Sequence, residues 1–435
     1  MFQTIRNAFK IPDLRRRIFF TIMMLIVFRF GAHIPVPYLN PEFMKEFLSG
    51  GGMDLFSLFD IFTGGAFSNA TVMALGVSPY INASIIVQLL TVAIPALERL
   101  AKEGAEGRKK INKITRYLGI ALAFVQGAGL YVTLHNIGVE SGLTTIQNEG
   151  VLTFFIITLT FTAGTAFIVW LGEIITEKGL GNGVSMIIFA GIVSRIPSGA
   201  LAIYNQFLAT GFNIKGVIIC LLILVIAILA ITLVVLFNSA ERRITVQYAK
   251  RVVGRKMYGG QSTNIPIKVA MAGVIPIIFA MSIMSFPGTL AQLFGKPDGV
   301  LVSITNFLTT GAIYPILYFL LIVGFTYFYT SITFNPIEVS NNLKTNNGAI
   351  PGIRPGRPTT EYISKVLSRL TLIGALCLGV IAVLPIVITM VMKTVDISRL
   401  SLTGTSLLIV VGVALETVRE VESQMLMRHY KGFLE

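Results

Sequence analysis

Two six-residue stretches, "GVSPYI" (residues 76–81) and "GVIPII" (residues 273–278), decide how this sequence is interpreted. Four of the six positions are identical, and both copies lie inside long apolar runs. Glycine weakens a helix, and proline removes one of its hydrogen bonds. The repeat therefore predicts two related helices with an interruption at the same place. In a chain rich in Gly, Val and Ile, the same match also arises by chance, so the positions of the two copies matter.

Composition indicates the class of protein. Of the 435 residues, 54% are apolar and 13% are charged, whereas about a quarter of the residues are charged in a soluble domain. The apolar residues form long runs separated by basic segments. We therefore expect an all-α integral membrane protein with a single membrane domain over residues 1–435. The two cysteines, Cys220 and Cys377, lie within apolar runs and predict neither a disulfide nor a metal site.

Ten apolar runs are each close to the roughly 20 residues that cross a bilayer as a helix. The sequence therefore predicts ten transmembrane helices. We expect them at residues 18–36, 72–94, 117–134, 152–171, 184–204, 217–237, 269–286, 312–329, 370–390 and 402–418.

Lys and Arg residues gather in alternate connections between these spans. The amino-terminal segment holds five, residues 98–116 seven, residues 241–268 seven, residues 334–369 five and the carboxyl-terminal segment three. Basic connections of membrane proteins face the cytoplasm. The chain is therefore expected to cross the membrane ten times with both termini in the cytoplasm.

This topology places the two copies of the repeat in the second and seventh spans. Each half, 18–204 and 217–418, then contains five spans, and an odd number makes the two halves run in opposite directions. Inverted repeats place interrupted helices near the middle of the membrane, beside the transport path. The equivalent positions of the two copies weaken the explanation by chance.

Residues 51–70, "GGMDLFSLFDIFTGGAFSNA", form an apolar segment that is too short and too polar to span a bilayer. One interpretation is a re-entrant helix, which must be buried in protein or line a cavity. The other is an amphipathic helix at the membrane surface. The sequence does not choose between them.

The spans contain few ionisable residues. Arg29 and Arg195 lie toward the outer ends of their spans, where long side chains can snorkel toward water. Ion-coupled transport normally needs Asp, Glu or His at mid-membrane depth, and a protease needs a nucleophile with a base or paired carboxylates. Neither pattern is evident, so we expect no catalytic residue, metal or cofactor. An ion-coupled secondary transporter with inverted repeats remains the alternative function, and an intramembrane enzyme comes third.

Several longer motifs together resemble the SecY family, the central subunits of bacterial protein-conducting channels. They are "FRFGAHIPVP", "ALGVSPYINASIIVQLL", "EKGLGNGVSMIIFAGIV", "AGVIPIIFA", "IPGIRPGRPT" and "GTSLLIVVGVALE". They occur in family order along essentially the whole chain. The resemblance implies two inverted five-helix halves around an hourglass pore that opens across the membrane and sideways into lipid. Unfolded secretory proteins would cross it, and segments of membrane proteins would leave it sideways.

The resemblance also implies roles for individual residues. A ring of aliphatic side chains would close the pore, and residues 56–70 would form a plug on its outer side. The ring would comprise Ile81, Ile85, Val184, Ile188, Ile278 and Ile409. The plug residues would include Phe56, Leu58, Phe59, Ile61, Phe62, Gly64 and Gly65.

A lateral gate between the second and seventh spans is expected to involve Pro79, Gln88, Ala270 and Pro276. The glycines and prolines of the repeat would loosen these two helices where they separate. Many bacterial relatives carry Asn at the position of Ala270, so the usual polar contact with Gln88 is in doubt. The sequence does not say how this residue affects the gate.

The resemblance also implies partners. The family assembles with the membrane subunits SecE and SecG, and its cytoplasmic loops bind the SecA ATPase or a ribosome with its nascent chain. Signal peptides, preproteins and the lipid bilayer complete the set, and the location would be the bacterial plasma membrane. The charge of the cytoplasmic docking loops, 241–268 and 334–369, by itself also fits a purely topogenic role. The docking residues would be Lys250, Arg251, Arg255, Lys256, Arg354 and Arg357.

Overall fold

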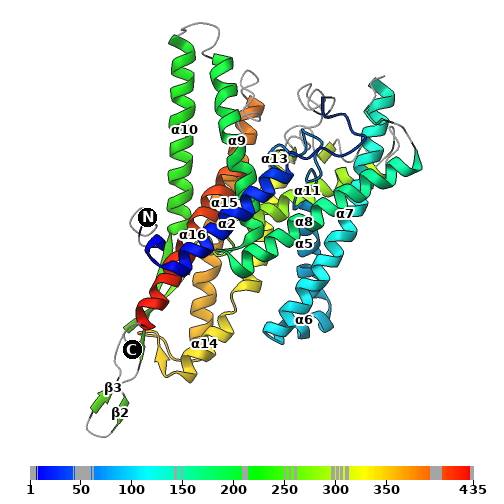
Figure 1. Ribbon diagram of the computed structural model, residues 1–435. Helices are drawn as coiled ribbons and strands as arrows, with labels where there is room; N and C mark the ends of the chain where they lie inside the picture. Colours follow the sequence, from blue (N-terminus) through cyan, green and yellow to red (C-terminus); the bar gives the residue numbers. More distant parts are fainter. Residues whose placement is uncertain are drawn as a thin grey trace.

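Long helices make up most of the computed structural model (Figure 1), which describes residues 6, 8–42, 44, 60, 63–141, 145–147, 150–207, 214–248, 251–253, 256–258, 262–294, 299, 303, 307–308, 313–391 and 404–431. Ten helices of 16 residues or more lie in these ranges. Five form an amino-terminal set: α2 (Pro12–Gly31), α5 (Ser78–Ala93), α7 (Ala105–Ser141), α8 (Val151–Lys178) and α9 (Gly183–Phe207). Five form a carboxyl-terminal set: α10 (Ile214–Ser239), α11 (Ile275–Phe294), α13 (Ile313–Thr333), α15 (Arg357–Val391) and α16 (Gly404–Lys431).

Each expected span overlaps one of these helices, which confirms the all-α fold class. Within the described residues, five helices are long and apolar enough to cross a membrane. A sixth span results if α5 and α6 (Pro95–Lys102), which are bent by 101° at Ile94, are counted together. The total of ten spans therefore stays a prediction.

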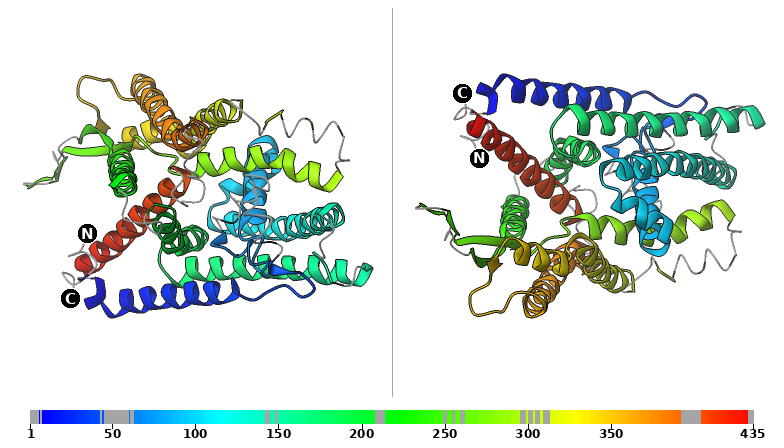
Figure 2. Two further views of the ribbon diagram at one scale, coloured as in Figure 1. Left: turned by 90° about the horizontal axis from the view of Figure 1, so that it is seen from above. Right: turned by 90° about the horizontal axis from the view of Figure 1, so that it is seen from below.

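The two sets of helices pack in the same pattern. In the amino-terminal set, α2 contacts α8 and α9, and the pairs α5–α7, α7–α8 and α8–α9 are in contact. In the carboxyl-terminal set, α10 contacts α15 and α16, and the pairs α11–α13, α13–α15 and α15–α16 are in contact. Figure 2 shows the two sets side by side, with α11 reaching across to α5 and α7, both of which it contacts. The order of the helices along the chain thus gives equivalent neighbours in both sets.

A small antiparallel sheet lies outside the two helical sets. Strand β1 (Glu241–Tyr248) pairs with β4 (Ser262–Lys268) on one side and with β5 (Gly348–Ala349) on the other. Helix α14 (Pro336–Thr345) and a hairpin of β2 (Arg251–Val253) and β3 (Lys256–Tyr258) complete this region. In Figure 1, α6, α14 and the hairpin lie toward the same lower side. Segments that are rich in Lys and Arg therefore gather at one end of the molecule.

The sheet has a hydrophobic core of its own, which we had not predicted within the docking loops. Ile244 and Val246 of β1 are buried beside Ile267 of β4 and Leu343 of α14. Alternate residues of β1 point inward because successive side chains of a strand face opposite sides. The two segments that are expected to dock partners are therefore attached to a packed platform.

The largest clusters of buried side chains follow the two sets. One cluster, around Phe161, belongs to the amino-terminal set, and another, around Tyr318, belongs to the carboxyl-terminal set. A third cluster takes buried residues from α2, α8, α9 and α16, and we call it the central cluster. Its buried members are Phe28, Ala32, Ala66, Met73, Val77, Ile168, Leu171, Ile175, Ile187, Ile188, Ile192, Ile409 and Val413.

Candidate functional site

The two copies of the repeated phrase adopt the same backbone conformation. Gly76 has a φ of 57° and Gly273 a φ of 58°. This left-handed region is open to glycine but strained for other residues. The amide of Gly76 donates to the carbonyl of Met73 (3.0 Å), and that of Gly273 donates to the carbonyl of Ala270 (3.2 Å). The glycines are therefore needed to form the same tight turn twice.

Both helices begin two residues after the glycine. Residues 72–77 and 269–274 are turns, and α5 and α11 begin at Ser78 and Ile275. Pro79 and Pro276 are the second residue of each helix, where a backbone N–H has no partner within the helix. The prediction that proline interrupts these helices is thus wrong. The interruption lies before the helix, and the proline favours its first turn.

The turn also sets which side chains face inward. The amide of Ile81 donates to the carbonyl of Val77 (3.0 Å), and the amide of Ile278 donates to that of Val274 (3.3 Å). Residues four apart lie on one face of a helix. Each copy therefore presents a valine and an isoleucine on the same side.

These side chains meet in the central cluster. Val77 is one of its buried members, and Ile81, Val274 and Ile278 pack against it while remaining partly buried. The segments 76–81 and 273–278 are almost 200 residues apart in sequence, yet both reach one point between the two sets. Of the other expected ring residues, Val184 and Ile188 lie on α9, Ile409 lies on α16, and Ile85 lies on α5.

Five of the six expected ring residues belong to or pack against the central cluster. Ile188 and Ile409 are buried in it, and Val184 packs against it together with Ile81 and Ile278. Ile85 is buried on α5, at 4% exposure, but lies outside this cluster. The structure therefore brings together aliphatic side chains from α5, α9, α11 and α16.

A second equivalence supports the repeat. A Cβ atom built at Gly164 of α8 would lie within 3.0 Å of the carbonyl oxygen of Val72. A Cβ atom built at Gly374 of α15 would lie within 3.0 Å of the carbonyl oxygen of Val269. Val72 and Val269 each precede the repeat glycine by four residues. The fourth helix of each set thus closes on the same turn through a glycine.

The expected plug is described from Asp60 onward, with gaps. Phe56, Leu58, Phe59, Ile61 and Phe62 lie outside the described residues. Gly64 and Gly65 have positive φ values of 66° and 90°, and Ala66 is fully buried in the central cluster. Of the two interpretations of residues 51–70, burial in the protein fits these described residues, and a surface helix does not.

Arg29 and Arg195 both contact the segment that includes Gly64. The Arg29 Nη1 atom donates to the carbonyl of Gly64 at 2.6 Å. Arg195 forms an ion pair with Asp60 and donates to Ser68 Oγ at 3.3 Å. Both side chains turn toward the segment that includes Gly64 because it offers acceptors inside the protein.

The sequence interpretation did not identify Asp60 as the partner of Arg195. Its side chain is 8% exposed, and Oδ1 accepts a hydrogen bond from the amide of Ser68 at 2.7 Å. Charges in apolar segments of membrane proteins usually pair with one another. An acidic residue in "LFDIF" and a basic residue in "IVSRIP" were therefore a recognisable signal.

The expected gate residues lie in different environments. Pro79 and Pro276 are buried, and Ala270 packs half-buried against the core of the carboxyl-terminal set. Gln88 is exposed on α5, where its main-chain carbonyl accepts a hydrogen bond from Thr91 Oγ1 (2.6 Å). The helices α5 and α11 are in contact, as a gate between them requires.

The expected docking residues are partly described. Arg354 is exposed on a turn with positive φ at Gly352 (82°) and Gly356 (101°), and Arg357 is exposed at the start of α15. Arg357 Nε donates to Glu361 Oε1 at 3.0 Å, and Arg354 accepts at its carbonyl from Thr359 Oγ1 at 2.9 Å. The turn is therefore fixed and projects its charges. Arg251 and Lys256 lie in the β2–β3 hairpin with their side chains undescribed, and Lys250 and Arg255 lie outside the described residues.

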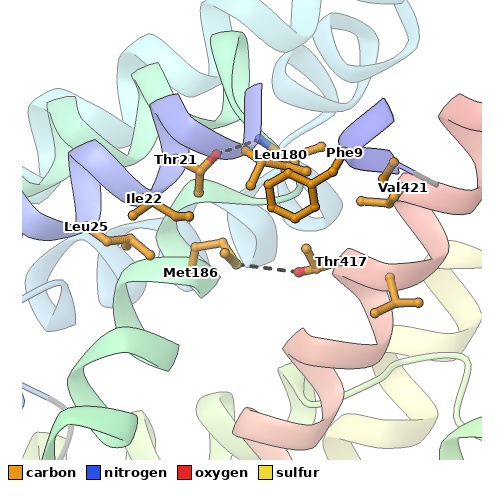
Figure 3. A pocket seen from close by; sticks show the side chains of 11 residues that line it. Phe9, Thr21, Ile22, Leu25, Leu180, Met186, Thr417 and Val421 are labelled. Carbon is orange, nitrogen blue, oxygen red and sulfur yellow. Dashed lines mark hydrogen bonds between the residues drawn. The ribbon is translucent and has the colours of Figure 1, made fainter. Parts of the chain in front are cut away.

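An apolar pocket of about 220 Å³ lies between α2 and α16, at the edge of the central cluster (Figure 3). Leu25 and Met186 line the pocket and also pack against the cluster. Two threonine hydroxyls reach it and are already engaged. Thr21 Oγ1 accepts from the amide of Leu180 (3.1 Å), and Thr417 Oγ1 donates to the carbonyl of Val413 (2.7 Å). The pocket is an apolar gap and has no features of an ion site.

Solved structures show the same fold. One titled "The structure of a protein conducting channel" aligns with a TM-score of 0.66 over 97% of both chains at 19% identity. Another, titled "The plug domain of the SecY protein stablizes the closed state of the translocation channel and maintains a membrane seal", aligns with a TM-score of 0.61 over 97% of both chains at 18% identity. A third, "Sec61 in the Canine ribosome-channel complex from the endoplasmic reticulum", gives 0.62 over 97% of both chains at 17% identity. At this identity, the likeness concerns the fold.

Relatives in sequence are much more similar. A protein translocase subunit SecY from Halalkalibacterium halodurans is 48% identical over 440 residues, covering 100% of both chains. One from Streptomyces coelicolor is 46% identical over 444 residues, again covering 100% of both chains. The SecY family model matches residues 71–418. The chain is therefore a multi-pass membrane protein that belongs to the SecY family.

Proposed function

We propose that this protein is a channel that conducts unfolded secretory proteins across a membrane and releases apolar segments sideways into lipid. The observation that supports this most is the central cluster. Both copies of the repeat deliver a valine and an isoleucine to it, and α9 and α16 add further aliphatic side chains. The names of the relatives and the titles of the solved structures point to the same activity.

An aliphatic constriction fits this task. Aliphatic side chains offer no hydrogen bonds to a passing backbone and no ligands to an ion, so they do not hold a substrate of any particular sequence. A hydrophobic constriction closes to water and ions by dewetting. Ile81, Val184 and Ile278 are only partly buried, which leaves them able to contact a chain at the ring. We propose that Ile81, Ile85, Val184, Ile188, Ile278 and Ile409 form this ring.

We further propose that the two sets of helices are inverted halves of one repeat. The shared packing pattern, the matching turns at Gly76 and Gly273 and the matching glycines on α8 and α15 support this. The contact between α5 and α11 is the seam at which the halves would separate. An apolar segment in the pore would leave for lipid through that seam.

Partners and location follow from the family. We propose that SecE and SecG accompany the chain in the membrane, and that SecA or a ribosome supplies the energy. The projecting turn with Arg354 and Arg357 and the β2–β3 hairpin would be the docking surfaces. The basic end of the molecule would then face the cytoplasm, with both termini on that side of a bacterial plasma membrane.

The decisive experiment traps a chain in the pore. Cys220 and Cys377 are replaced by Ser, and Ile278→Cys supplies a single cysteine. A secretory chain carrying one cysteine is arrested midway across the membrane by SecA or a stalled ribosome, and disulfide formation is measured. The control is Leu229→Cys, at a position on α10 that is 62% exposed and thus suited to face lipid.

We expect a disulfide at Ile278→Cys and at Ile81→Cys, and none at Leu229→Cys. This result would put both copies of the repeat on the path of the substrate. If the secretory chain crosses the membrane without a disulfide at either isoleucine, the central cluster is not the pore constriction.

A further inference from the structure

A largely buried polar network lies where the amino-terminal set of helices meets Asp60 and residues 63–70. Asp60 pairs with Arg195 of α9, and the Asp60 side chain also accepts from the amide of Ser68 (2.7 Å). Arg195 is 27% exposed and donates to Ser68 Oγ (3.3 Å). Removing one partner of a buried pair leaves the other charge uncompensated, and the cost is high. The pair is therefore a strong hold on this segment.

A second arginine holds the same segment from another helix. Arg29 of α2 donates to the carbonyl of Gly64 at 2.6 Å. Gly64 lies directly against α9, because a Cβ atom there would come within 2.9 Å of the Cα atom of Gly191. The Arg29 guanidinium and the close backbone approach to α9 thus hold Gly64, while Arg195 holds Asp60 and Ser68.

This segment also touches the central cluster. Ala66 is fully buried in it beside Val77 and residues of α9. Thr63 contacts the turn of the first repeat, since a Cβ atom at Gly76 would lie 2.8 Å from Thr63 Cγ2. Residues 63–70 therefore rest on the cluster, and Arg29 and Arg195 hold groups at one end of this segment.

The two arginine anchors come from the amino-terminal set, on α2 and α9. The seam between α5 and α11 lies between the two sets. A movement of α11 away from α5 therefore breaks neither the Asp60–Arg195 pair nor the Arg29–Gly64 hydrogen bond. Separating the helices and freeing the segment have different structural requirements.

We propose that Asp60, Arg195 and Arg29 form a latch that holds residues 63–70 on the pore constriction, and that its release is a step separate from the parting of α5 and α11. This inference rests on the proposed channel function. The latch adds to the stability of the closed state, so a substrate must supply that energy before it passes. Water that enters from the outer side would rehydrate the charges once the segment leaves.

The test measures exposure of the segment without a transported chain. Thr63, which is 3% exposed, is replaced by Cys in a Cys220→Ser, Cys377→Ser background. The full-length protein in its membrane complex is placed in lipid nanodiscs, and a charged thiol reagent is added. We expect Asp60→Asn to accelerate labelling by about tenfold or more, because Arg195 loses its counter-charge. Arg195→Lys keeps the charge and should stay close to the parent.

Two further variants keep the test decisive. Asp60→Asn combined with Arg195→Gln should label no faster than Asp60→Asn alone, because both remove one interaction. Arg116→Gln breaks an ion pair between α7 and α8 and serves as the matched control, since Arg116 lies away from the segment. If Asp60→Asn leaves labelling unchanged, or if Arg116→Gln accelerates it equally, the latch does not exist.

The same complexes are used to test whether the latch is released independently of the separation of α5 and α11. Fluorophores at Leu90→Cys on α5 and Ile283→Cys on α11, both exposed positions, report the distance between the two helices. We expect Asp60→Asn to leave this distance unchanged. An increase in distance that accompanies faster labelling would show that latch and seam open together and would overturn the proposal. Since no substrate is used, the trapped-chain experiment can succeed or fail independently.

Discussion

The two copies of the repeated phrase share one backbone but differ in their neighbours. Gly76 and Gly273 have φ values of 57° and 58°, and both precede a helix whose second residue is proline. At Gly76 a Cβ atom would come within 2.8 Å of Thr63, whereas at Gly273 no atom of the described residues lies within 4 Å. Within the described part of the chain, the first copy therefore supports another segment and the second does not.

This difference distinguishes features that both copies of the repeat share from features that are found in the amino-terminal set. The turn, the helix start and the Val–Ile face are common to both copies, so they belong to the shared architecture. The contact with Thr63 and the anchoring arginines occur in the amino-terminal set. Substitutions at equivalent positions distinguish the two kinds of feature.

The largest effect is expected at the glycines that close on the two turns. Gly164→Val and Gly374→Val each place a side chain within 3.0 Å of a backbone carbonyl, at Val72 or Val269. Such overpacking costs about 1–3 kcal/mol or more, because a backbone atom yields less readily than a side chain. Thermal unfolding in detergent should show a large decrease in the unfolding temperature of both variants. Gly324→Val on α13, where nothing lies within 4 Å, is the control. If only one glycine is sensitive, the equivalence of α8 and α15 fails.

The next effect compares the repeat glycines. Both Gly76→Ala and Gly273→Ala force an L side chain into the left-handed region, at about 1–2 kcal/mol. Gly76→Ala should lower the free energy of unfolding more than Gly273→Ala, because its Cβ meets Thr63 Cγ2. Thr63→Ser removes that methyl group and keeps the hydroxyl. In the double variant, Gly76→Ala should then cost about the same as Gly273→Ala. If Gly76→Ala still lowers the denaturation midpoint more than Gly273→Ala does when Thr63 is Ser, the extra destabilisation does not come from this contact.

Smaller effects are expected at the prolines. Pro79→Ala and Pro276→Ala should each change the free energy of unfolding by less than about 1 kcal/mol, since proline in a first turn mainly restricts the unfolded chain. The α5–α11 distance, measured with the fluorophore pair, should not change. A clear shift in that distance in either variant would restore the earlier expectation that these prolines loosen the gate helices.

The smallest effect concerns an ion pair within the amino-terminal set. Arg116 Nη1 lies 3.2 Å from Glu173 Oε2, joining α7 to α8, and the two side chains are 41% and 36% exposed. Exposed pairs contribute about 0–1 kcal/mol and are screened by salt. A double-mutant cycle with Arg116→Gln and Glu173→Gln should give a coupling in that range that fades at high salt. A larger, salt-independent coupling would mean that the pair is effectively buried and holds the set together.

Much of the fold was predictable because the signals extend over many residues. The ten apolar runs all fall on helices, but α7 and α15 continue well beyond the expected spans, to Ala105 and Arg357. Apolar composition marks the membrane-compatible part of a helix, and a polar extension of the same helix has no such signal. The starts of α5 and α11 were also misplaced, because a glycine turn inside an apolar run does not change its composition.

Most of the site came from resemblance, and the rest depended on three-dimensional neighbours. The aliphatic ring residues lie together, apart from Ile85, but only Ile81 and Ile278 belong to the repeated phrase. The Asp60–Arg195 pair joins residues that are 135 positions apart, and neither sequence context names its partner. The sheet was missed although Ile244, Val246 and Ile267 alternate with polar residues. The positive charge of that segment predicts docking, whereas its short alternation of apolar and polar residues is a weaker signal for strands.

The helix starts at Ser78 and Ile275 have an electrical consequence. The amino end of a helix carries about half a positive elementary charge. The first turns of α5 and α11 both reach the central cluster through Ile81 and Ile278. Two positive helix ends would therefore raise the electrostatic potential at the proposed, uncharged constriction. Such a field would oppose small cations, whereas an extended polypeptide, neutral along most of its length, would be little affected.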